Sequence, residues 1–462
     1  MHPTRTSIIL PLALALAAAP LCAQSIPERY RDVANRIITA AQADSAAWNR
    51  MAELSDRFGN RLSGSESLEH ALDWVLAEMR RDGLENVRGE PVMVPHWVRG
   101  EESLELVSPR RMSIPMLGLG NSDGTGGRTI TAEVLVVSSF DELDRRAGEA
   151  RGKIVLWDVP WQNYGFNVQY RGRGAIAAAR AGAVASIIRS AEAYSIRSPH
   201  TGWMGYDSTT PHIPGAAIPI EDAAMLHRMQ SRGEHVVLSL RMDARMLPDV
   251  PSKNVMGEVA GSEHPEEVVV LGGHMDSWDV GAGAMDDGGG VVAAWEAVKL
   301  LQRLGLRARR TIRVVGWVNE ENGGRGGQGY RDAHAAQLGG HDLAIETDAG
   351  VFRPTGFGFS GSDSALAIVR EVAQLLSPIG ADSISRGGGG SDIEPIMQRG
   401  VPGMGLDTDG SRYFWFHHSQ GDTPDKLDPH EMAQCVAALA VMAYVVADLP
   451  EPLPRAAPAV TH

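Results

Sequence analysis

Residues 251–450 alternate between strand-like and helix-like segments, and this alternation limits the folds that the chain can adopt. Apolar runs rich in valine and isoleucine predict strands, and apolar residues at three- and four-residue spacing predict helices. The predicted strands lie at 265–277, 310–321 and 341–350, and the predicted helices at 288–305, 327–339 and 363–380. This order favours an α/β fold in which helices cover both faces of one sheet.

The rest of the chain divides into further regions with different patterns. Residues 24–97 show mostly helical periodicity, and we expect them to form the N-terminal helical part of the same domain. Residues 98–250 are richer in proline, glycine and short β-rich runs, with one helical pattern, and we expect an inserted, β-rich domain there. Residues 451–462 form a C-terminal tail.

The first 23 residues have the pattern of a secretory signal peptide. An arginine precedes an apolar run, and small residues follow the run, with a plausible cleavage site after Ala23. The run is short for a membrane span, and no other stretch is apolar enough to predict a transmembrane segment. Export to the periplasm or the medium is therefore expected. Cleavage would remove Cys22 and leave Cys435 alone, so the sequence predicts no intramolecular disulfide.

The balance of charges bears on the class of partner. The formal net charge is −14. Nucleic acids need a basic surface, so we do not expect a nucleic acid as the main partner. The sequence does not decide the oligomeric state, and a homodimer is compatible with it.

Acidic residues and histidines gather directly after the predicted strands. His274 and Asp276 follow the first strand, Glu320 and Glu321 the second, and Asp348 the third. The carboxyl ends of parallel strands share one edge of a sheet, and binding sites form at that edge. The sequence therefore predicts that these side chains converge on one site.

Several carboxylates brought together repel one another unless a cation neutralises them. Nitrogen and oxygen ligands without a thiolate favour zinc, although cobalt or manganese would accept the same donors. The candidate carboxylates outnumber those that a single ion needs, which suggests two ions with a shared ligand. His417 and His418, in a loop before the last predicted helix, offer further nitrogen donors.

Spacing suggests how the roles divide. Residues two apart in an extended segment point the same way, so the Asp276 carboxylate is expected to orient the ring of His274. Glu320 and Glu321 are adjacent and cannot point the same way, so one can bind metal while the other acts as a general base.

Five motifs in order resemble one enzyme family. They are "GGHMDSW", "GAMDDGGG", "WVNEENGGRGG", "ETDAG" and "HHSQGDT". The chain is similar over nearly its whole mature length to the di-zinc exopeptidases, which include secreted aminopeptidases and glutamate carboxypeptidases, and most similar to the carboxypeptidase Q branch. The resemblance implies a mixed, mostly parallel sheet flanked by helices, and a protease-associated-like domain at 98–250.

The resemblance also implies a set of metal ligands for two zinc ions. Asp286 would bridge the ions, His274 and Asp348 would complete one, and Glu321 and His418 the other. His418 matches the family ligand because it directly precedes the serine of the "HSQGDT" segment. Asp287 is left out of this set, because it suits the cap of the following helix, and Asp279 is expected to be a turn residue.

The implied activity is hydrolysis of dipeptides or short peptides. Glu320 would be the general base for a zinc-activated water, and Asp276 would support His274. His417 or Tyr413 is a candidate donor to the oxyanion. The glycine-rich segment 387–392 would form a wall of the substrate cleft.

Three arginines near the motifs are candidates to pair with a substrate carboxylate, namely Arg325, Arg386 and Arg412. Two alternatives stay open beside the peptidase. The same site could act on a non-peptide amide or as a glutaminyl cyclase, or the scaffold could serve as a binding protein without catalysis.

Overall fold

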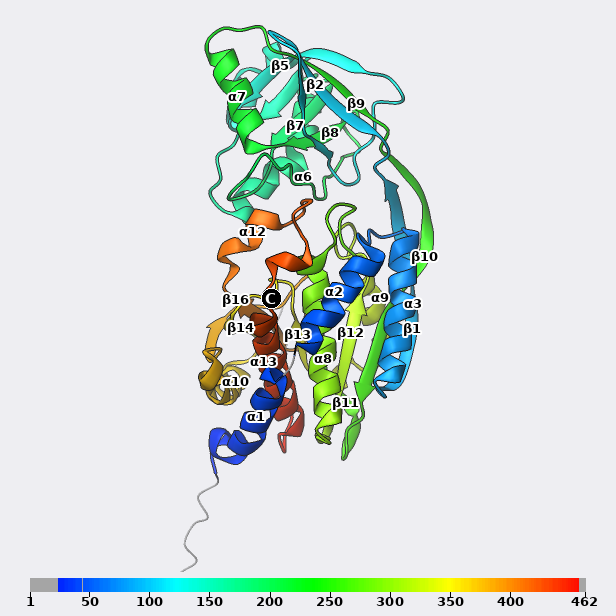
Figure 1. Cartoon of the computed structure of the whole chain (residues 1–462), viewed down its shortest axis with the longest axis vertical. Coiled ribbons are helices and arrows are strands. Elements are labelled where there is room, and N and C mark those ends of the chain that lie inside the picture. Colours follow the sequence, from blue (N-terminus) through cyan, green and yellow to red (C-terminus); the bar gives the residue numbers. More distant parts are fainter. Residues whose placement is uncertain (1–23, 44, 457–462) are drawn as a thin grey trace, which may run out of the picture.

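The computed structural model describes residues 24–43 and 45–456, so the expected signal peptide and residues 457–462 of the C-terminal tail lie outside the described residues. The described chain forms two eight-stranded sheets. Figure 1 shows them as two lobes, one above the other. We call the lobe with the sheet β1-β10-β12-β11-β13-β16-β14-β15 the main lobe, and the other the second lobe.

The main sheet is mixed, with parallel strands at its centre. β12, β11, β13 and β16 are parallel neighbours, whereas β1, β10 and β12 pair antiparallel. In spatial order its strands are β1 (Glu85–Val98), β10 (Arg245–Val259), β12 (Arg310–Trp317), β11 (His264–His274), β13 (His341–Glu346), β16 (Gly403–Thr408), β14 (Pro354–Ser360) and β15 (Ser383–Arg386). The expected mixed α/β fold is thus confirmed.

Successive residues of the central strands enter two different cores, which explains their continuous apolar runs. Val269 and Leu271 of β11 pack into the larger core, while Val268 and Val270 pack into the smaller core on the opposite face. Strands that are buried on both faces do not alternate between apolar and polar residues, and the strands at the centre of this sheet follow that rule.

Helices cover both faces of the main sheet. The larger core contains residues of α1 (Ile26–Gln42), α2 (Ala46–Phe58), α3 (Glu66–Arg81), α8 (Gly289–Arg303), α10 (Asp363–Ala373) and α13 (Pro429–Asp448). The smaller core contains residues of α9 (Arg325–Ala333) and α11 (Glu394–Met397). The short turns are η1 (Ala284–Gly288), η2 (Leu338–Gly340), η3 (Gln374–Ile379), η4 (Gly410–Arg412), α12 (Tyr413–Phe416) and η5 (Pro424–Lys426).

Contrary to the expectation that no stretch after the first 23 residues is apolar enough, one helix among the described residues, α13, is long and apolar enough to cross a membrane. Its most apolar window is 83% buried inside the protein. It packs beside α8 against the centre of the main sheet, as Figure 1 shows. A helix that is apolar all round and buried is a core helix, and Cys435 on it is a buried free thiol.

The second sheet is parallel at its centre and is also covered on both faces. Its strands are, in spatial order, β3 (Met112–Ile114), β2 (Glu102–Ser108), β9 (Val237–Met242), β5 (Ile130–Val137), β6 (Ile154–Trp157), β7 (Ala185–Arg189), β8 (Gly215–Ile218) and β4 (Leu117–Gly118). Its helices are α4 (Phe140–Arg145), α5 (Ala147–Ala150), α6 (Tyr164–Arg180) and α7 (Ile220–Ser231). Residues of α7 belong to one core, and residues of α4 and α6 to the other.

In two segments the sequence patterns did not predict all of the helices and strands. The segment 24–97 contains three helices but ends in β1, a long strand that the helical periodicity did not predict. The segment 98–250 contains four helices where one was expected, and β10 runs through residue 250. β1 and β10 pair along their whole length, with Val98 opposite Arg245, so the chain leaves and re-enters the main lobe at adjacent points.

Candidate metal and catalytic site

Three parallel neighbours of the main sheet deliver polar side chains to one edge. His274 is the last residue of β11, Glu320 and Glu321 lie three and four residues past the end of β12, and Asp348 lies two residues past the end of β13. Because these strands run in the same direction, their carboxyl ends meet at this edge.

Asp286 lies between two histidines that come from distant parts of the chain. Its Oδ1 is 3.2 Å from Nε2 of His274, and its Oδ2 is 3.2 Å from Nε2 of His418. Asp286 belongs to η1, an irregular turn between β11 and α8. Each of the two oxygens of the Asp286 carboxylate thus faces a different imidazole ring.

Each histidine faces a second carboxylate as well. His274 Nε2 lies 3.5 Å from Asp348 Oδ1, and His418 Nε2 lies 3.1 Å from Glu321 Oε2. The arrangement therefore consists of two similar halves joined at Asp286. His417 Nε2 also lies 3.4 Å from Asp286 Oδ2, so both neighbouring histidines reach the same carboxylate.

Several polar atoms of this cluster are buried and lack hydrogen-bond partners. Nε2 of His274, Oδ2 of Asp286, Oε1 of Glu321 and Oδ1 of Asp348 have none. Buried polar atoms are normally satisfied, and a bound cation satisfies nitrogen and carboxylate donors of this kind. Among the described residues, three groups of three side chains, which also include Asp287 and His417, have donors close enough for one ion. The residues present therefore fit bound metal ions.

Burial and like charges shape the pKa values in the cluster. Burial, together with the charge of Asp286, raises the pKa of Glu321 to about 8, despite the opposing effect of His418. Burial likewise raises the pKa of Asp348 to about 6. Burial opposes ionisation of Asp286 too, but the nearby imidazoles of His274 and His418 hold its pKa well below the usual value. Such a set of acids needs compensating positive charge in order to ionise together.

Asp276 contacts the ring of His274 through its backbone oxygen, whereas the sequence led us to expect a contact from its carboxylate. The ring Nδ1 of His274 lies 2.9 Å from the backbone oxygen of Asp276, while the carboxylate is 3.9 Å away. The Asp276 carboxylate instead accepts hydrogen bonds from the backbone N–H groups of Glu320 and Glu321, at 3.2 and 3.4 Å, and from the hydroxyl of Ser63. The main chain of Asp276 orients the histidine, and its side chain anchors the turn that carries the two glutamates.

Asp279 is absent from these groups of converging donors in the described part of the chain, whereas Asp287, which the expected ligand set leaves out, has a carboxylate oxygen close to donor atoms of His274 and Asp348. Asp287 accepts hydrogen bonds from the backbone N–H groups of Gly290 and His274, each at 3.1 Å, so it caps the start of α8 and secures β11. Asp279 lies in a bend and forms an ion pair with Arg99, at 2.5 Å.

A pocket of about 320 Å³ opens onto the cluster between the two lobes. The main lobe contributes acidic residues of the cluster together with Tyr413, His417 and Ser391, the last from the glycine-rich segment expected to form a wall of the cleft. The full lining is Tyr164, Arg171, Asp286, Glu320, Glu321, Asp348, Ser391, Tyr413, Phe414, His417 and His418. In Figure 1, α12 lies at the junction of the lobes, just before the two histidines.

The second lobe contributes residues that no sequence pattern indicated. Tyr164 and Arg171 lie on α6, and both line the pocket. Thr201 of the same lobe donates its backbone N–H to the carbonyl of His418 at 2.9 Å, and its own carbonyl lies 3.4 Å from Nδ1 of His418. His418 has a φ of 59°, which is uncommon for a residue with a side chain, so contacts that hold its backbone matter.

The three arginines expected to bind substrate do not line this pocket. Arg386 forms an ion pair with Asp363 at 2.8 Å, and Arg412 forms one with Glu431 at 3.3 Å. Arg325 is exposed at the start of α9.

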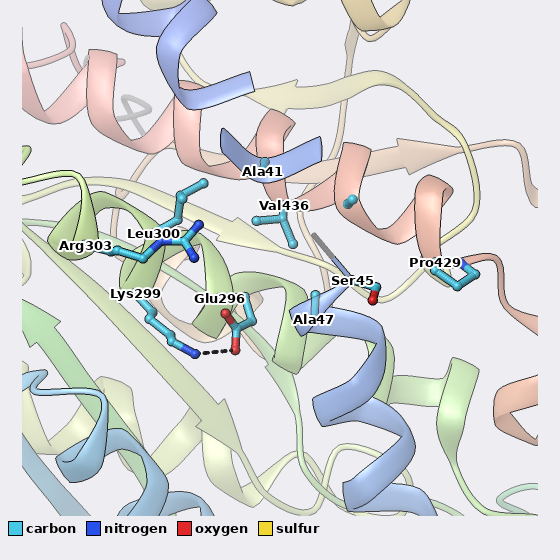
Figure 2. Close-up of a pocket in the computed structure, with 10 residues that line it drawn as sticks. Ala41, Ser45, Ala47, Glu296, Lys299, Leu300, Arg303, Pro429 and Val436 are labelled. Carbon is cyan, nitrogen blue, oxygen red and sulfur yellow. Dashed lines mark hydrogen bonds and ion pairs between the residues drawn. The ribbon is translucent and has the colours of Figure 1, made fainter. Parts of the chain in front are cut away.

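A second pocket lies away from the cluster, between α1, α8 and α13. Figure 2 shows its lining, with Lys299 and Glu296 of α8 in contact across one side. Its volume is about 20 Å³, which is room for roughly one water molecule. It is too small for a peptide substrate.

Comparisons with known proteins agree with the motifs. Residues 254–443 match peptidase family M28. Over 429 residues the chain is 51% identical to carboxypeptidase Q of Xenopus laevis, and the match covers 92% of each protein. The expected resemblance is therefore confirmed.

Solved structures match the whole described architecture. A peptidase M28 precursor from Shewanella amazonensis SB2B is 35% identical, with a TM-score of 0.90 and coverage of 93% of this chain and 99% of that chain. A zinc aminopeptidase from Bacillus subtilis is 20% identical, with a TM-score of 0.66 and coverage of 86% and 93%, which shows a shared fold.

Proposed function

The chain belongs to peptidase family M28, and from this membership we propose that it is a zinc-dependent exopeptidase that hydrolyses dipeptides or short peptides. The observation that carries the proposal is the position of Asp286. Its two carboxylate oxygens face two histidines, and each histidine faces one further carboxylate. The names of similar proteins, carboxypeptidase Q and zinc aminopeptidase, support the choice of reaction and metal.

Two zinc ions would share Asp286 as a common ligand. His274 and Asp348 would complete one ion, and Glu321 and His418 the other. This assignment is supported by the ion-pair distances and by the unpartnered donor atoms. When bound, zinc lowers the pKa of water and polarises a carbonyl group, which is the chemistry that peptide hydrolysis needs.

Glu320 would act as the general base. It lines the pocket beside the cluster, and the Asp276 carboxylate holds its backbone N–H, so the turn that carries it is anchored. In this role the Glu320 carboxylate removes a proton from the attacking water and passes it to the leaving amine.

Tyr413 and His417 are the candidates to stabilise the oxyanion. Burial and the surrounding carboxylates raise the pKa of Tyr413 well above its usual value, so its hydroxyl keeps a proton to donate. Burial and the nearby His418 lower the pKa of His417 well below its usual value, so that its ring is neutral. Both side chains line the pocket.

The remaining parts of the proposal concern location and domain organisation. We propose export directed by residues 1–23, and we propose that residues 98–250 are an inserted, protease-associated-like domain. The separate second sheet and its two cores support the second point.

The test uses a library of dipeptides and their blocked amides, with amino-acid release as the measurement. The zinc-loaded protein should hydrolyse unblocked dipeptides, and a chelator should abolish the activity until zinc is added back. Glu320→Gln should lower kcat by about 10²- to 10⁴-fold without loss of bound metal. Turnover of blocked amides alone would instead favour a non-peptide amidase or a cyclase. A protein that binds no metal, and whose rate Glu320→Gln leaves unchanged, would refute the proposal.

A further inference from the structure

We propose that Arg61 and Asp422 hold the turn of Asp286 from two sides and thereby set how tightly the protein binds zinc. This inference rests on the proposed di-zinc site and adds two positioning residues that are not ligands themselves. It begins from the connecting loop, residues 275–283, which joins the proposed ligand His274 to the turn that carries Asp286. The connecting loop forms neither helix nor strand, so the regular backbone hydrogen bonds of such elements do not fix its path.

Arg61 contacts both ends of the connecting loop from the segment between α2 and α3. Its Nε donates to the carbonyl of Met275 at 2.9 Å, its Nη1 to that of Ala282 at 2.9 Å and its Nη2 to that of Gly283 at 2.8 Å. A second Nη1 donor reaches the carbonyl of Gly59 at 2.9 Å, so four of the five N–H groups of the guanidinium are directed at backbone oxygens. A planar guanidinium with these hydrogen bonds holds the start and the end of the loop at a fixed separation.

Asp422 binds the same turn through the opposite kind of backbone group. Its Oδ1 accepts from the N–H groups of Ala284 and Met285, at 3.0 and 2.7 Å, and its Oδ2 accepts from the N–H of Asp286 at 3.2 Å. Arg61 thus binds backbone oxygens just before the turn, while Asp422 binds consecutive N–H groups within it. The main chain of Asp286 is therefore held from both sides, and the direction of its carboxylate depends on its main chain.

Asp422 also connects the two halves of the cluster. It lies four residues after His418, and its N–H donates to the carbonyl of Ser419 at 3.2 Å. Its own carbonyl accepts from the N–H of Ala282 in the connecting loop at 2.7 Å. The spacing between Asp286 and His418, whose side chains face each other at 3.2 Å, therefore depends on Asp422.

Both charged side chains are buried in the protein. Arg61 is 0% exposed and Asp422 is 3% exposed. Burial lowers the pKa of Arg61 to about 10, which leaves the guanidinium charged at neutral pH. Hydrogen bonds to charged groups are strong, and the loss of a partner is costly for a buried group. Gly283 permits the close packing, because its φ is 54° and an added Cβ would lie 2.4 Å from Cβ of Ser277.

The charge of Arg61 allows its role to be tested by the sign of the effect. Arg61 and zinc are both cations, so through charge alone the loss of Arg61 would strengthen zinc binding. Through the geometry of the turn, the same loss would weaken zinc binding, because Asp286 would no longer face both histidines in one arrangement. We expect the geometric effect to be the larger, since four hydrogen bonds are lost and nearby carboxylates offset the charge of Arg61.

The experiment measures the Kd of zinc by competition between the zinc-loaded protein and a chromophoric chelator. Arg61→Gln and Asp422→Asn should each raise this Kd by roughly 10- to 100-fold. The double variant should raise it by less than the product of the two single effects, because a turn that is released on one side is already loose. Arg61→Lys keeps the charge without the planar set of donors, so its Kd should still rise by at least about 10-fold. It is the second variant if Arg61→Gln does not fold.

Arg310→Gln and Asp342→Asn are the matched controls. Arg310 is 1% exposed and donates to the carbonyl of Leu449 at 2.6 Å, and Asp342 is 4% exposed and accepts from the N–H of Leu453 at 2.6 Å. Both lie at the amino ends of their strands, β12 and β13, whereas the cluster follows the carboxyl ends. The controls should lower the Tm but keep the Kd of zinc within about 2-fold of the wild type.

Several results would overturn the proposal. An unchanged Kd in either single variant, or a lower Kd in Arg61→Gln, would mean that the residue does not hold the turn for zinc. A wild-type Kd in Arg61→Lys would mean that only the charge is needed, and a double variant that equals the product would mean that the two residues act separately. An equal rise of the Kd in the controls would mean that lost stability alone weakens zinc binding.

A general role in folding and a failure of the proposed function can both be recognised. If neither Arg61 variant folds while Arg310→Gln does, Arg61 serves the whole fold and the proposal is wrong. If the wild type itself binds no zinc, the proposed function fails. If the wild type binds zinc and the variants bind it equally tightly, only the roles of Arg61 and Asp422 are refuted.

Discussion

Replacing Asp276 by asparagine separates the two tasks that this residue performs. The substitution keeps the backbone carbonyl that faces Nδ1 of His274, so the histidine should keep its orientation. It changes the carboxylate, whose Oδ1 and Oδ2 accept from the N–H groups of Glu320 and Glu321 respectively. An asparagine offers one acceptor and places an N–H₂ group against the other backbone donor.

The size of the effect follows from this single mismatch in a fully buried site. A hydrogen bond to a charged group contributes about 1.5–3 kcal/mol, so its loss corresponds to roughly a 10- to 100-fold fall in kcat/KM. The turn that carries Glu320 and Glu321 would move, and Glu320 would no longer face the pocket correctly. Ser63→Ala removes only the hydroxyl that also contacts Asp276, so it should cost less than about 10-fold.

The assay is steady-state hydrolysis of a dipeptide together with metal content measured by mass spectrometry. We expect Asp276→Asn to bind the same amount of zinc as the wild type. Its kcat/KM should be lower by roughly 10- to 100-fold. A variant that has lost zinc but retains normal turnover per bound metal would refute the reasoning. It would mean that the carboxylate of Asp276, and not its main chain, supports His274.

Two further predictions concern stability. Removal of metal by a chelator should lower the Tm, because the acids of the cluster then repel one another. Zinc at 100 times its Kd should restore about 2.7 kcal/mol per ion, and calorimetry that shows the same Tm with and without chelator would contradict this. The second prediction concerns His341, which is far from the cluster, accepts from the Tyr330 hydroxyl at 2.9 Å and has a pKa lowered to about 4 by burial. Because this folded-state pKa lies below the unfolded value of 6.5, the associated stability is present above pH 6.5 and is lost as the pH falls towards 4. Urea unfolding at pH 7 and pH 5 should show a loss of about 2 kcal/mol that is absent in His341→Gln, and equal losses in both proteins would contradict the assignment.

The central part of the fold could be predicted because its pattern is local. β11, α8, β12, α9 and β13 are marked by apolar runs and by helical spacing that each segment carries by itself. β1 could not be predicted in this way, because its sequence mixes charged residues with Pro91 and Pro95, and its partner β10 lies about 150 residues away. Edge strands depend on pairing that a local pattern does not contain.

The candidate site shows the same division. His274, Glu320, Glu321 and Asp348 follow strands whose direction could be inferred, and the structure brings these side chains together with Asp286 and His418. The roles of the individual groups could be compared only in the structure. Spacing alone suggested that the Asp276 carboxylate would hold His274, but it is the backbone oxygen of Asp276 that lies next to the ring. Arg171 had no signal at all, because it is one of several arginines on a helix of another lobe, and only the tertiary structure places it beside His418.

The pairing of β1 with β10 makes the second lobe, in topological terms, the loop of one very long hairpin. Val98 and Arg245 are opposite each other, so a short turn could join them and leave the main sheet closed. Such a shortened chain would nevertheless lose Thr201, which contacts both the backbone and the ring of His418. The connectivity of the chain would therefore allow the second lobe to be removed, but its removal would take away a contact to His418. In a lineage that discarded it, we would expect a replacement contact to His418 to arise from within the main lobe.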